Sequence, residues 1–125
     1  MASKPKLKWD FAIGTTSRVP SRPGYHYLMM DIDGTLGEIP AYLRKLGAEL
    51  VILQPTPSGG WHIYTDLVYS WKKLFKAMPL RTDKKWLNIG GRRGYLFLAD
   101  KGRVNFPWQV ERMVLHYNGK KKIDA

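Results

Sequence analysis

The stretch at residues 25–33 constrains the fold of this chain more than any other. It reads Tyr-His-Tyr-Leu-Met-Met-Asp-Ile-Asp, and its aromatic, alternating residues are typical of a β-strand. Because successive side chains on a strand point to opposite faces, Asp31 and Asp33 share one face at the strand end. Gly34 then lets the chain turn away. The two carboxylates repel each other unless water, a base or a cation such as Mg²⁺ takes up their charge.

Composition narrows the class of protein and of partner. The 125 residues suffice for one folded domain with its own core. With 21 Lys and Arg against 10 Asp and Glu, the net charge of +11 favours nucleic acid as a partner first and an anionic membrane second. The absence of cysteine excludes disulfides and thiolate zinc sites, so no zinc is expected. No apolar run approaches the roughly 18 residues of a membrane-spanning helix, and we expect a cytoplasmic protein without a signal peptide or a membrane partner.

The chain divides near residue 24. Residues 1–24 combine Lys and Arg with Pro, Gly and small polar residues, which predicts a basic N-terminal arm that can lie along a phosphate backbone. The alternative is a solvated tail with one short strand at residues 9–13. Residues 25–125 are expected to form the functional domain.

Periodicity and turn residues predict the order of elements after the first strand. The expected elements are a helix at residues 39–46, strands at 49–54 and 61–69 around a turn at 55–60, a helix at 71–78, strands at 83–89 and 95–99 around a turn at 90–94, and a helix at 107–117.

This order predicts an α+β fold. It is that of a ferredoxin-like or RRM-like (RNA-recognition-motif-like) βαββαβ antiparallel sheet, with an extra hairpin strand and a C-terminal helix. In this topology the first strand is central, and its end lies beside the starts of the third and fourth strands. We therefore expect Asp31, Asp33, His62 and Asp83 to meet at one edge of the sheet.

Two motifs in this region resemble those of the archaeo-eukaryotic primase (primase-polymerase) superfamily. Asp31-Ile-Asp33 resembles its first motif, a strand-borne Asp-hydrophobic-Asp, and Ser58-Gly-Gly-Trp-His62 resembles its second, a small-residue turn leading into a strand His. The resemblance covers roughly residues 25–99 and implies a minimal catalytic core, with residues 25–125 as the primase-like domain.

The third motif of that family is a hydrophobic residue and an Asp on a later strand. Asp83 is the candidate, although Thr82 stands before it where the family has a large apolar residue. Asp100, at the end of the hairpin strand, is the second choice.

The resemblance implies template-directed nucleotidyl transfer by a DNA primase or polymerase, acting in DNA replication. Asp31, Asp33 and Asp83 would be catalytic and would hold two Mg²⁺ or Mn²⁺ ions. The His would contact the triphosphate, and the Gly-Gly backbone N–H groups could cradle phosphates. The expected nucleotide-binding residues are Ser58, Gly59, Gly60 and His62. Expected partners are nucleoside triphosphates and single-stranded or primer-template nucleic acid; the sequence specifies no helicase or larger primase subunit.

Basic and aromatic side chains supply further candidates for contact with nucleic acid. Arginines in a Gly-rich turn suit phosphate or template contact, lysines flank a helical stripe, and tyrosines on the open sheet face can stack on a base. These candidates are Arg92, Arg93, Lys72, Lys73, Tyr27 and Tyr64.

Two other functions stay open. Residues 28–36, Leu-Met-Met-Asp-Ile-Asp-Gly-Thr-Leu, also resemble the first motif of haloacid-dehalogenase-type phosphatases, with Asp31 as the nucleophile and Asp33 as the acid or base. Thr56 could serve as the second motif of that family, whose fold is a doubly wound sheet. The third possibility is a non-catalytic, nucleic-acid-binding relative of the primase fold.

Overall fold

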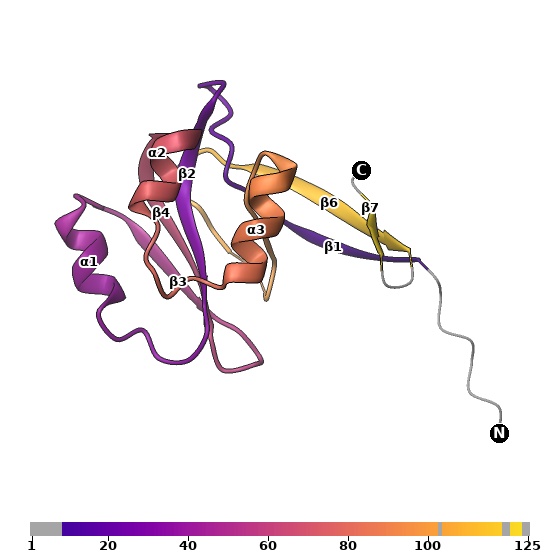
Figure 1. Ribbon diagram of the computed structural model, residues 1–125, viewed down its shortest axis with the longest axis horizontal. Coiled ribbons are helices and arrows are strands. Elements are labelled where there is room, and N and C mark those ends of the chain that lie inside the picture. The colour runs from indigo at the N-terminus through magenta and orange to yellow at the C-terminus, as the bar shows by residue number, and fades with distance from the viewer. Residues whose placement is uncertain (1–8, 103, 119–120, 124–125) are drawn as a thin grey trace.

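This computed structural model describes residues 9–102, 104–118 and 121–123 of the chain (Figure 1). The protein is α+β, and its described strands form one sheet of four strands and one of three. In chain order the elements are β1 (Trp9–Thr16), β2 (Tyr25–Ile32), α1 (Ile39–Lys45), β3 (Val51–Pro55), β4 (Trp61–Ser70), α2 (Trp71–Ala77), α3 (Lys84–Arg93), β5 (Phe97–Ala99), β6 (Glu111–Asn118) and β7 (Lys121–Ile123).

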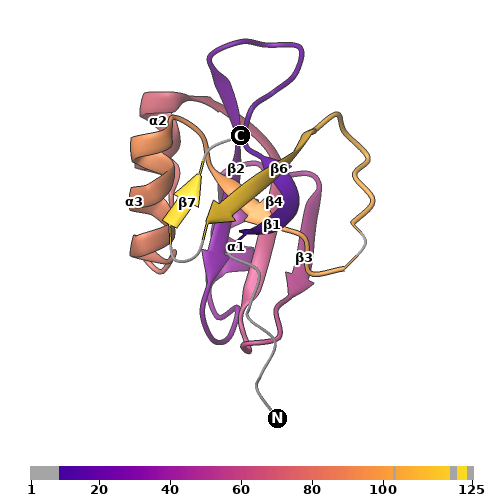
Figure 2. The same cartoon turned by 90° about the vertical axis from the view of Figure 1, so that its right-hand side faces the viewer.

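The smaller sheet has the strand order β2-β4-β3 and is antiparallel throughout. Helices α2 and α3 cover one side of it, and the chain between β5 and β6 passes over the other (Figure 2). Coverage of both sides explains why β2 is an almost continuous apolar run, with Leu28, Met29 and Met30 fully buried. Across this sheet His62 on β4 pairs with Asp31 on β2.

The larger sheet has the order β5-β1-β6-β7, and its β1–β6 ribbon extends away from the helices (Figure 1). Ser17 joins it to the smaller sheet. The Ser17 backbone N–H donates to the carbonyl oxygen of Leu96 at 2.9 Å, and the Ser17 carbonyl oxygen accepts from the N–H of Tyr27 at 2.7 Å. The end of β1 is therefore held between β2 and the residues that lead into β5.

The first half of the expected element order is confirmed. The helices expected at residues 39–46 and 71–78 are α1 and α2, and the strands expected at 49–54 and 61–69 are β3 and β4. The strand expected at 95–99 is present in shorter form as β5.

The helix expected at residues 107–117 is wrong, because this region contains β6. The apolar residues Val110, Met113, Val114 and Tyr117 recur at helical spacing, but pairing with a distant strand overrides this local period. The deciding partner is β1, which pairs with β6 from Trp9 and Asn118 to Thr16 and Glu111. Residues 9–16 thus belong to a sheet, as the alternative of a short strand anticipated, while residues 1–8 of the expected arm lie outside the described residues.

The strand expected at residues 83–89 and the hairpin turn expected at 90–94 are also wrong. The Asp83 side chain instead caps α3, accepting the N–H of Trp86 at 3.1 Å, and Gly94 ends this helix in the left-handed conformation. The apolar residues of α3 favoured a strand in the sequence, yet its Asp and Gly are helix-end signals. At the place expected for the fourth strand, Thr82 forms a single antiparallel bridge with Ile32 of β2.

No helix among the described residues is long and apolar enough to cross a membrane.

Candidate active site

Asp31 and Asp83 are held together at the end of β2. The carbonyl oxygen of Asp31 accepts the backbone N–H of Asp83 at 2.8 Å and the hydroxyl of Thr82 at 3.2 Å. The N–H of Asp31 is 3.3 Å from the same hydroxyl oxygen. Asp83 therefore reaches the position beside Asp31 that a fourth strand would have given it, although it begins a helix.

Arg81 fixes the loop that carries Asp33. Its Nη2 donates to the carbonyl oxygens of Asp33 at 3.2 Å and Thr35 at 2.5 Å, and its Nη1 donates to that of Leu36 at 3.2 Å. Nη1 also forms an ion pair with Glu38 at 3.0 Å. The guanidinium thus ties the loop after β2 to the segment before α3, a role that the sequence did not indicate.

The turn between β3 and β4 approaches the end of β2 closely. A β-carbon on Gly60 would lie 2.3 Å from the carbonyl oxygen of Ile32, so only glycine fits there. The N–H groups of Gly59 and Gly60 donate to the carbonyl and hydroxyl oxygens of Thr56. Both N–H groups are therefore used within the turn in this structure. They are not free to cradle phosphates, which is the role that the sequence suggests for them.

These segments enclose a surface pocket of about 370 Å³. Its lining combines carboxylates, hydroxyls, an imidazole and an amine. The lining residues are Asp31, Asp33, Thr56, Pro57, Ser58, His62, Asp83 and Lys101. The structure thus brings the three expected carboxylates together with His62 and Ser58.

Burial sets the charge states in the pocket. It raises the pKa of Asp31 to about 6, helped by the neighbouring charges of Asp83 and Asp33 and opposed by Lys101. Burial also lowers the pKa of His62 to about 4, helped by Lys101 and opposed by the backbone carbonyl of Ala99. His62 Nε2 is 3.8 Å from Asp31 Oδ1, yet the imidazole is neutral at pH 7, so the two side chains do not form an ion pair.

The donor set suits hard divalent cations. Among the described residues, no three acidic or histidine side chains form a preassembled metal cluster. Asp31, Asp33 and Asp83 nevertheless line one pocket, and the last two raise the pKa of the first, so a cation would relieve a repulsion that already exists. Mg²⁺ and Mn²⁺ prefer carboxylate oxygens and commonly complete their coordination with substrate phosphates and water.

Lys101 is the pocket residue that the sequence did not reveal. It follows Asp100, whose N–H donates to the carbonyl oxygen of Ile13 at 2.8 Å and whose carboxylate forms an ion pair with Arg112 on β6. The larger sheet thereby positions Lys101 in a pocket built on the smaller one. Asp100 is not part of the lining, so Asp83 is the third aspartate that lines the pocket.

Tyr27 and Tyr64 are not on an open face, and this expectation was wrong. They are 8% and 1% exposed, respectively, so neither ring can stack on a base in this structure. Phe106 packs edge-on against Tyr64, and Trp108 lies beside Tyr27 with ring centroids 6.0 Å apart. Both covering residues come from the chain between β5 and β6.

The basic candidates lie on helices rather than at a hairpin tip. Lys72 and Lys73 are exposed in the first turn of α2. Arg92 is exposed in the last turn of α3, whereas Arg93 lies over the ring of Tyr95 with its guanidinium carbon 5.2 Å from the centroid.

Comparison with models of protein families, with curated proteins and with solved structures finds no match for this chain. The chemistry of the pocket therefore carries the inference of function. Three carboxylates can hold cations, and the hydroxyls, the neutral imidazole and the amine can donate hydrogen bonds to an anionic substrate.

Proposed function

We propose that this protein is a metal-dependent nucleotidyltransferase of the primase or polymerase type, which joins nucleotides on a nucleic-acid template. The observation that carries the proposal is the convergence of Asp31, Asp33, His62 and Asp83 in one pocket. The primase-like motifs imply this grouping, and it arises here although Asp83 lies on an unexpected element. A ferredoxin-like description of the β2-β4-β3 sheet and a cytoplasmic location belong to the same proposal.

Asp31, Asp33 and Asp83 would hold the divalent cations. When bound, a pair of such ions activates the attacking 3′-hydroxyl and stabilises the leaving pyrophosphate. The arrangement places two of the carboxylates at the end of β2 and the third at the start of α3, tied to β2 by backbone hydrogen bonds. This attachment keeps the carboxylates close together before any substrate arrives.

The other pocket residues would bind the triphosphate. His62 is neutral at pH 7, so it can donate a hydrogen bond to a phosphate oxygen without repelling cations. The hydroxyls of Thr56 and Ser58, 3.2 Å apart, add two donors on the turn. The ammonium of Lys101 adds a positive charge from the segment that follows β5 of the larger sheet.

The phosphatase alternative has one observation in its favour and one against it. Thr56 lies in the same pocket as Asp31 and Asp33, as a haloacid-dehalogenase-type site would require. The doubly wound sheet of that family is parallel, however, whereas β2, β4 and β3 pair antiparallel. The antiparallel pairing favours nucleotidyl transfer.

The test is incorporation of radiolabelled nucleotides on primed and unprimed templates with Mg²⁺ or Mn²⁺. We expect metal-dependent extension by the wild type and its loss in Asp31→Asn, with nucleic-acid affinity equal or slightly raised because a negative charge is removed. Glu49→Gln, which neutralises an exposed carboxylate outside the pocket, should retain activity. Phosphomonoester hydrolysis with a phosphorylated Asp31 and no incorporation would instead support the phosphatase. Oligonucleotide binding with neither activity would support a non-catalytic relative.

A further inference from the structure

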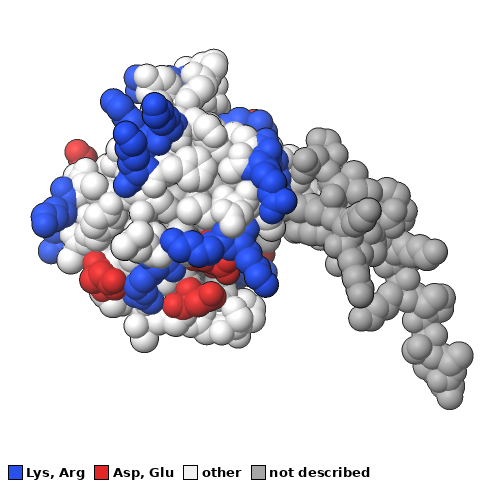
Figure 3. All heavy atoms as spheres, viewed as in Figure 1, with Lys and Arg blue, Asp and Glu red and all other residues white. Residues whose placement is uncertain are grey.

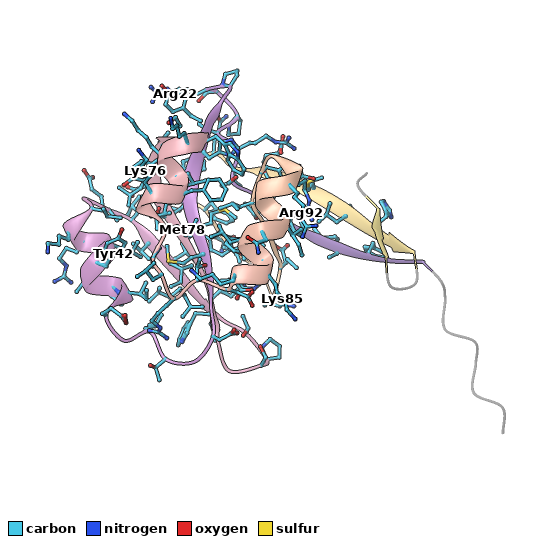
Figure 4. All side chains as sticks on the ribbon, viewed as in Figure 1. Arg22, Tyr42, Lys76, Met78, Lys85 and Arg92 are labelled. Atoms are coloured by element: carbon cyan, nitrogen blue, oxygen red, sulfur yellow. The ribbon has the colours of Figure 1, made fainter. Side chains whose placement is uncertain are left out.

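Exposed basic side chains lie in several groups on the side of the molecule covered by α2 and α3 (Figure 3). Lys76 on α2 and Lys85 and Arg92 on α3 all project from this side (Figure 4). We define the α2–α3 basic face by the exposed basic residues of these two helices, which are Lys72, Lys73, Lys76, Lys84, Lys85 and Arg92.

The two helices lie next to each other. They cover the same side of the smaller sheet (Figures 1 and 2). They also lie close together, because a β-carbon added to Gly91 of α3 would lie 3.9 Å from the Phe75 ring of α2. The lysines of α2 and those of α3 can therefore contact one extended ligand.

Among the residues that the structure describes, no carboxylate neutralises the charges of this face. Elsewhere, Arg18 pairs with Glu111, Arg81 with Glu38 and Arg112 with Asp100. Within the part of the chain that the structure describes, no side chain of the α2–α3 basic face forms an ion pair. The face therefore presents a concentrated positive charge to an external partner.

The position of the lysines also disfavours the helices that carry them. Lys72 and Lys73 lie in the first turn of α2, and Lys84 and Lys85 in the first turn of α3, with no acidic residue in either turn. The helix dipole makes positive charge unfavourable at this end. A helix-stabilising role thus does not explain these lysines, whereas an anionic partner does.

We propose that the α2–α3 basic face binds the sugar-phosphate backbone of the nucleic acid whose end enters the acidic pocket. This assignment rests on the proposed function for the role of the pocket. Lys84 and Lys85 directly follow Asp83 of the pocket, and Arg92 lies eight residues beyond Lys84 on α3. That distance is about 12 Å of helix axis, a length over which one strand of a duplex presents about three phosphates.

The test measures binding of fluorescent single-stranded and primer-template oligonucleotides by anisotropy over a range of salt concentrations. EDTA is present and nucleoside triphosphate absent, so catalysis plays no part. Each double variant, Lys72→Gln/Lys73→Gln and Lys84→Gln/Lys85→Gln, should reduce the slope of log affinity against log salt by about 1.4 to 1.8, because two counterion-releasing contacts are lost. Affinity at low salt should fall correspondingly.

The matched control is Arg44→Gln/Lys45→Gln, which removes two exposed charges from the last turn of α1. Its slope should stay close to that of the wild type and its affinity within about twofold, because diffuse charge contributes less than direct phosphate contact. The single variants Lys73→Gln and Lys85→Gln keep the comparison available if a double variant fails to fold.

The proposal would be overturned if all three double variants lost the same affinity and salt slope. It would also be overturned if the α2 and α3 double variants lost neither. So would binding to phosphatidylserine vesicles through the same lysines with no binding to oligonucleotides. A wild type that binds oligonucleotides through this face but incorporates no nucleotide would refute the proposed function and leave the binding surface intact.

Discussion

At the scale of single residues, the chemistry of His62 depends on its burial. The side chain lines the pocket, yet the residue is only 6% exposed. Its low pKa keeps it neutral even beside the carboxylate of Asp31. A neutral imidazole offers one donor and one acceptor, which suits a hydrogen bond to a phosphate oxygen within a group of carboxylates.

His62→Ala should therefore weaken triphosphate binding by roughly tenfold, the value of one hydrogen bond to a charged group. Oligonucleotide affinity should stay unchanged, since the α2–α3 basic face is intact. Fluorescent nucleoside triphosphate titrations in Mg²⁺ measure the effect, and His116→Ala, an exposed histidine on β6, is the control. Unchanged triphosphate affinity in His62→Ala would remove this residue from the nucleotide site.

His26 links stability to pH. It is buried on β2, with Nδ1 2.7 Å from the Ser17 hydroxyl, and burial, together with the charge of Arg18, lowers its pKa below the ordinary 6.5. As pH falls through 6.5, the unfolded chain takes up a proton before the folded chain does, so the free energy of unfolding decreases.

We predict that His26→Gln removes part of this decrease. Urea unfolding at about pH 7.5 and about pH 5.5 should show that the stability advantage of the wild type over the variant shrinks at the lower pH. His62 is present in both proteins, so its own titration cancels from the comparison. If the difference in the free energy of unfolding between the wild type and His26→Gln did not depend on pH, His26 would not titrate as its surroundings indicate.

At the scale of elements, two adjacent glycines of α3 have different surroundings. A β-carbon on Gly90 would lie 2.5 Å from Cδ2 of the buried Leu96 and 3.3 Å from the carbonyl oxygen of Tyr95. A β-carbon on Gly91 would make only an ordinary contact with Phe75. The first glycine is needed for packing, whereas the second is not.

Gly91→Ala should therefore raise the free energy of unfolding by about 0.5–1 kcal/mol, because alanine loses less backbone entropy in a helix. Gly90→Ala should lower it by about 1–2 kcal/mol through overpacking. Chemical denaturation of the two variants measures both effects, and changes of the same sign would contradict this account of α3.

The elements also show what local sequence can and cannot predict. The patterns of β2, β3, β4, α1 and α2 are visible in their own residues, and their bounds differ from the expectation by about one or two residues at most. β6 depends on pairing with β1, nearly a hundred residues away, which no local period reveals. Two glycines inside α3 hid a helix whose Asp83 cap was nevertheless present in the sequence.

The site was more predictable than the fold. Asp31, Asp33 and His62 were placed together by strand parity and pairing, which depend on β2 and β4 alone. Asp83 lies in the same pocket because Thr82, the residue before it, is hydrogen-bonded to the end of β2. This attachment places Asp83 there whether a strand or a helix comes next. Lys101 and Arg81 act through contacts between distant segments, so their own sequence surroundings carry no signal.

At the scale of the whole molecule, the acidic pocket and the α2–α3 basic face are neighbours, because Asp83 of the pocket directly precedes Lys84 and Lys85 of α3. The carboxylates gather at the end of the smaller sheet, and the exposed lysines lie on the helices α2 and α3 that cover one side of it. The larger sheet connects to this arrangement through the residues that precede Lys101. In the proposed function, the acidic pocket binds cations and triphosphate, and the α2–α3 basic face holds the strand.

The most direct measurement of the central claim is Mn²⁺ binding, followed by electron paramagnetic resonance, with a nonhydrolysable nucleoside triphosphate. The carboxylates and the phosphates share the cations, so binding to the wild type should tighten when the triphosphate is added. Asp31→Asn and Asp83→Asn should each weaken it, and Glu49→Gln should leave it unchanged. Mn²⁺ binding that is equal in all four proteins would contradict a shared metal and nucleotide site.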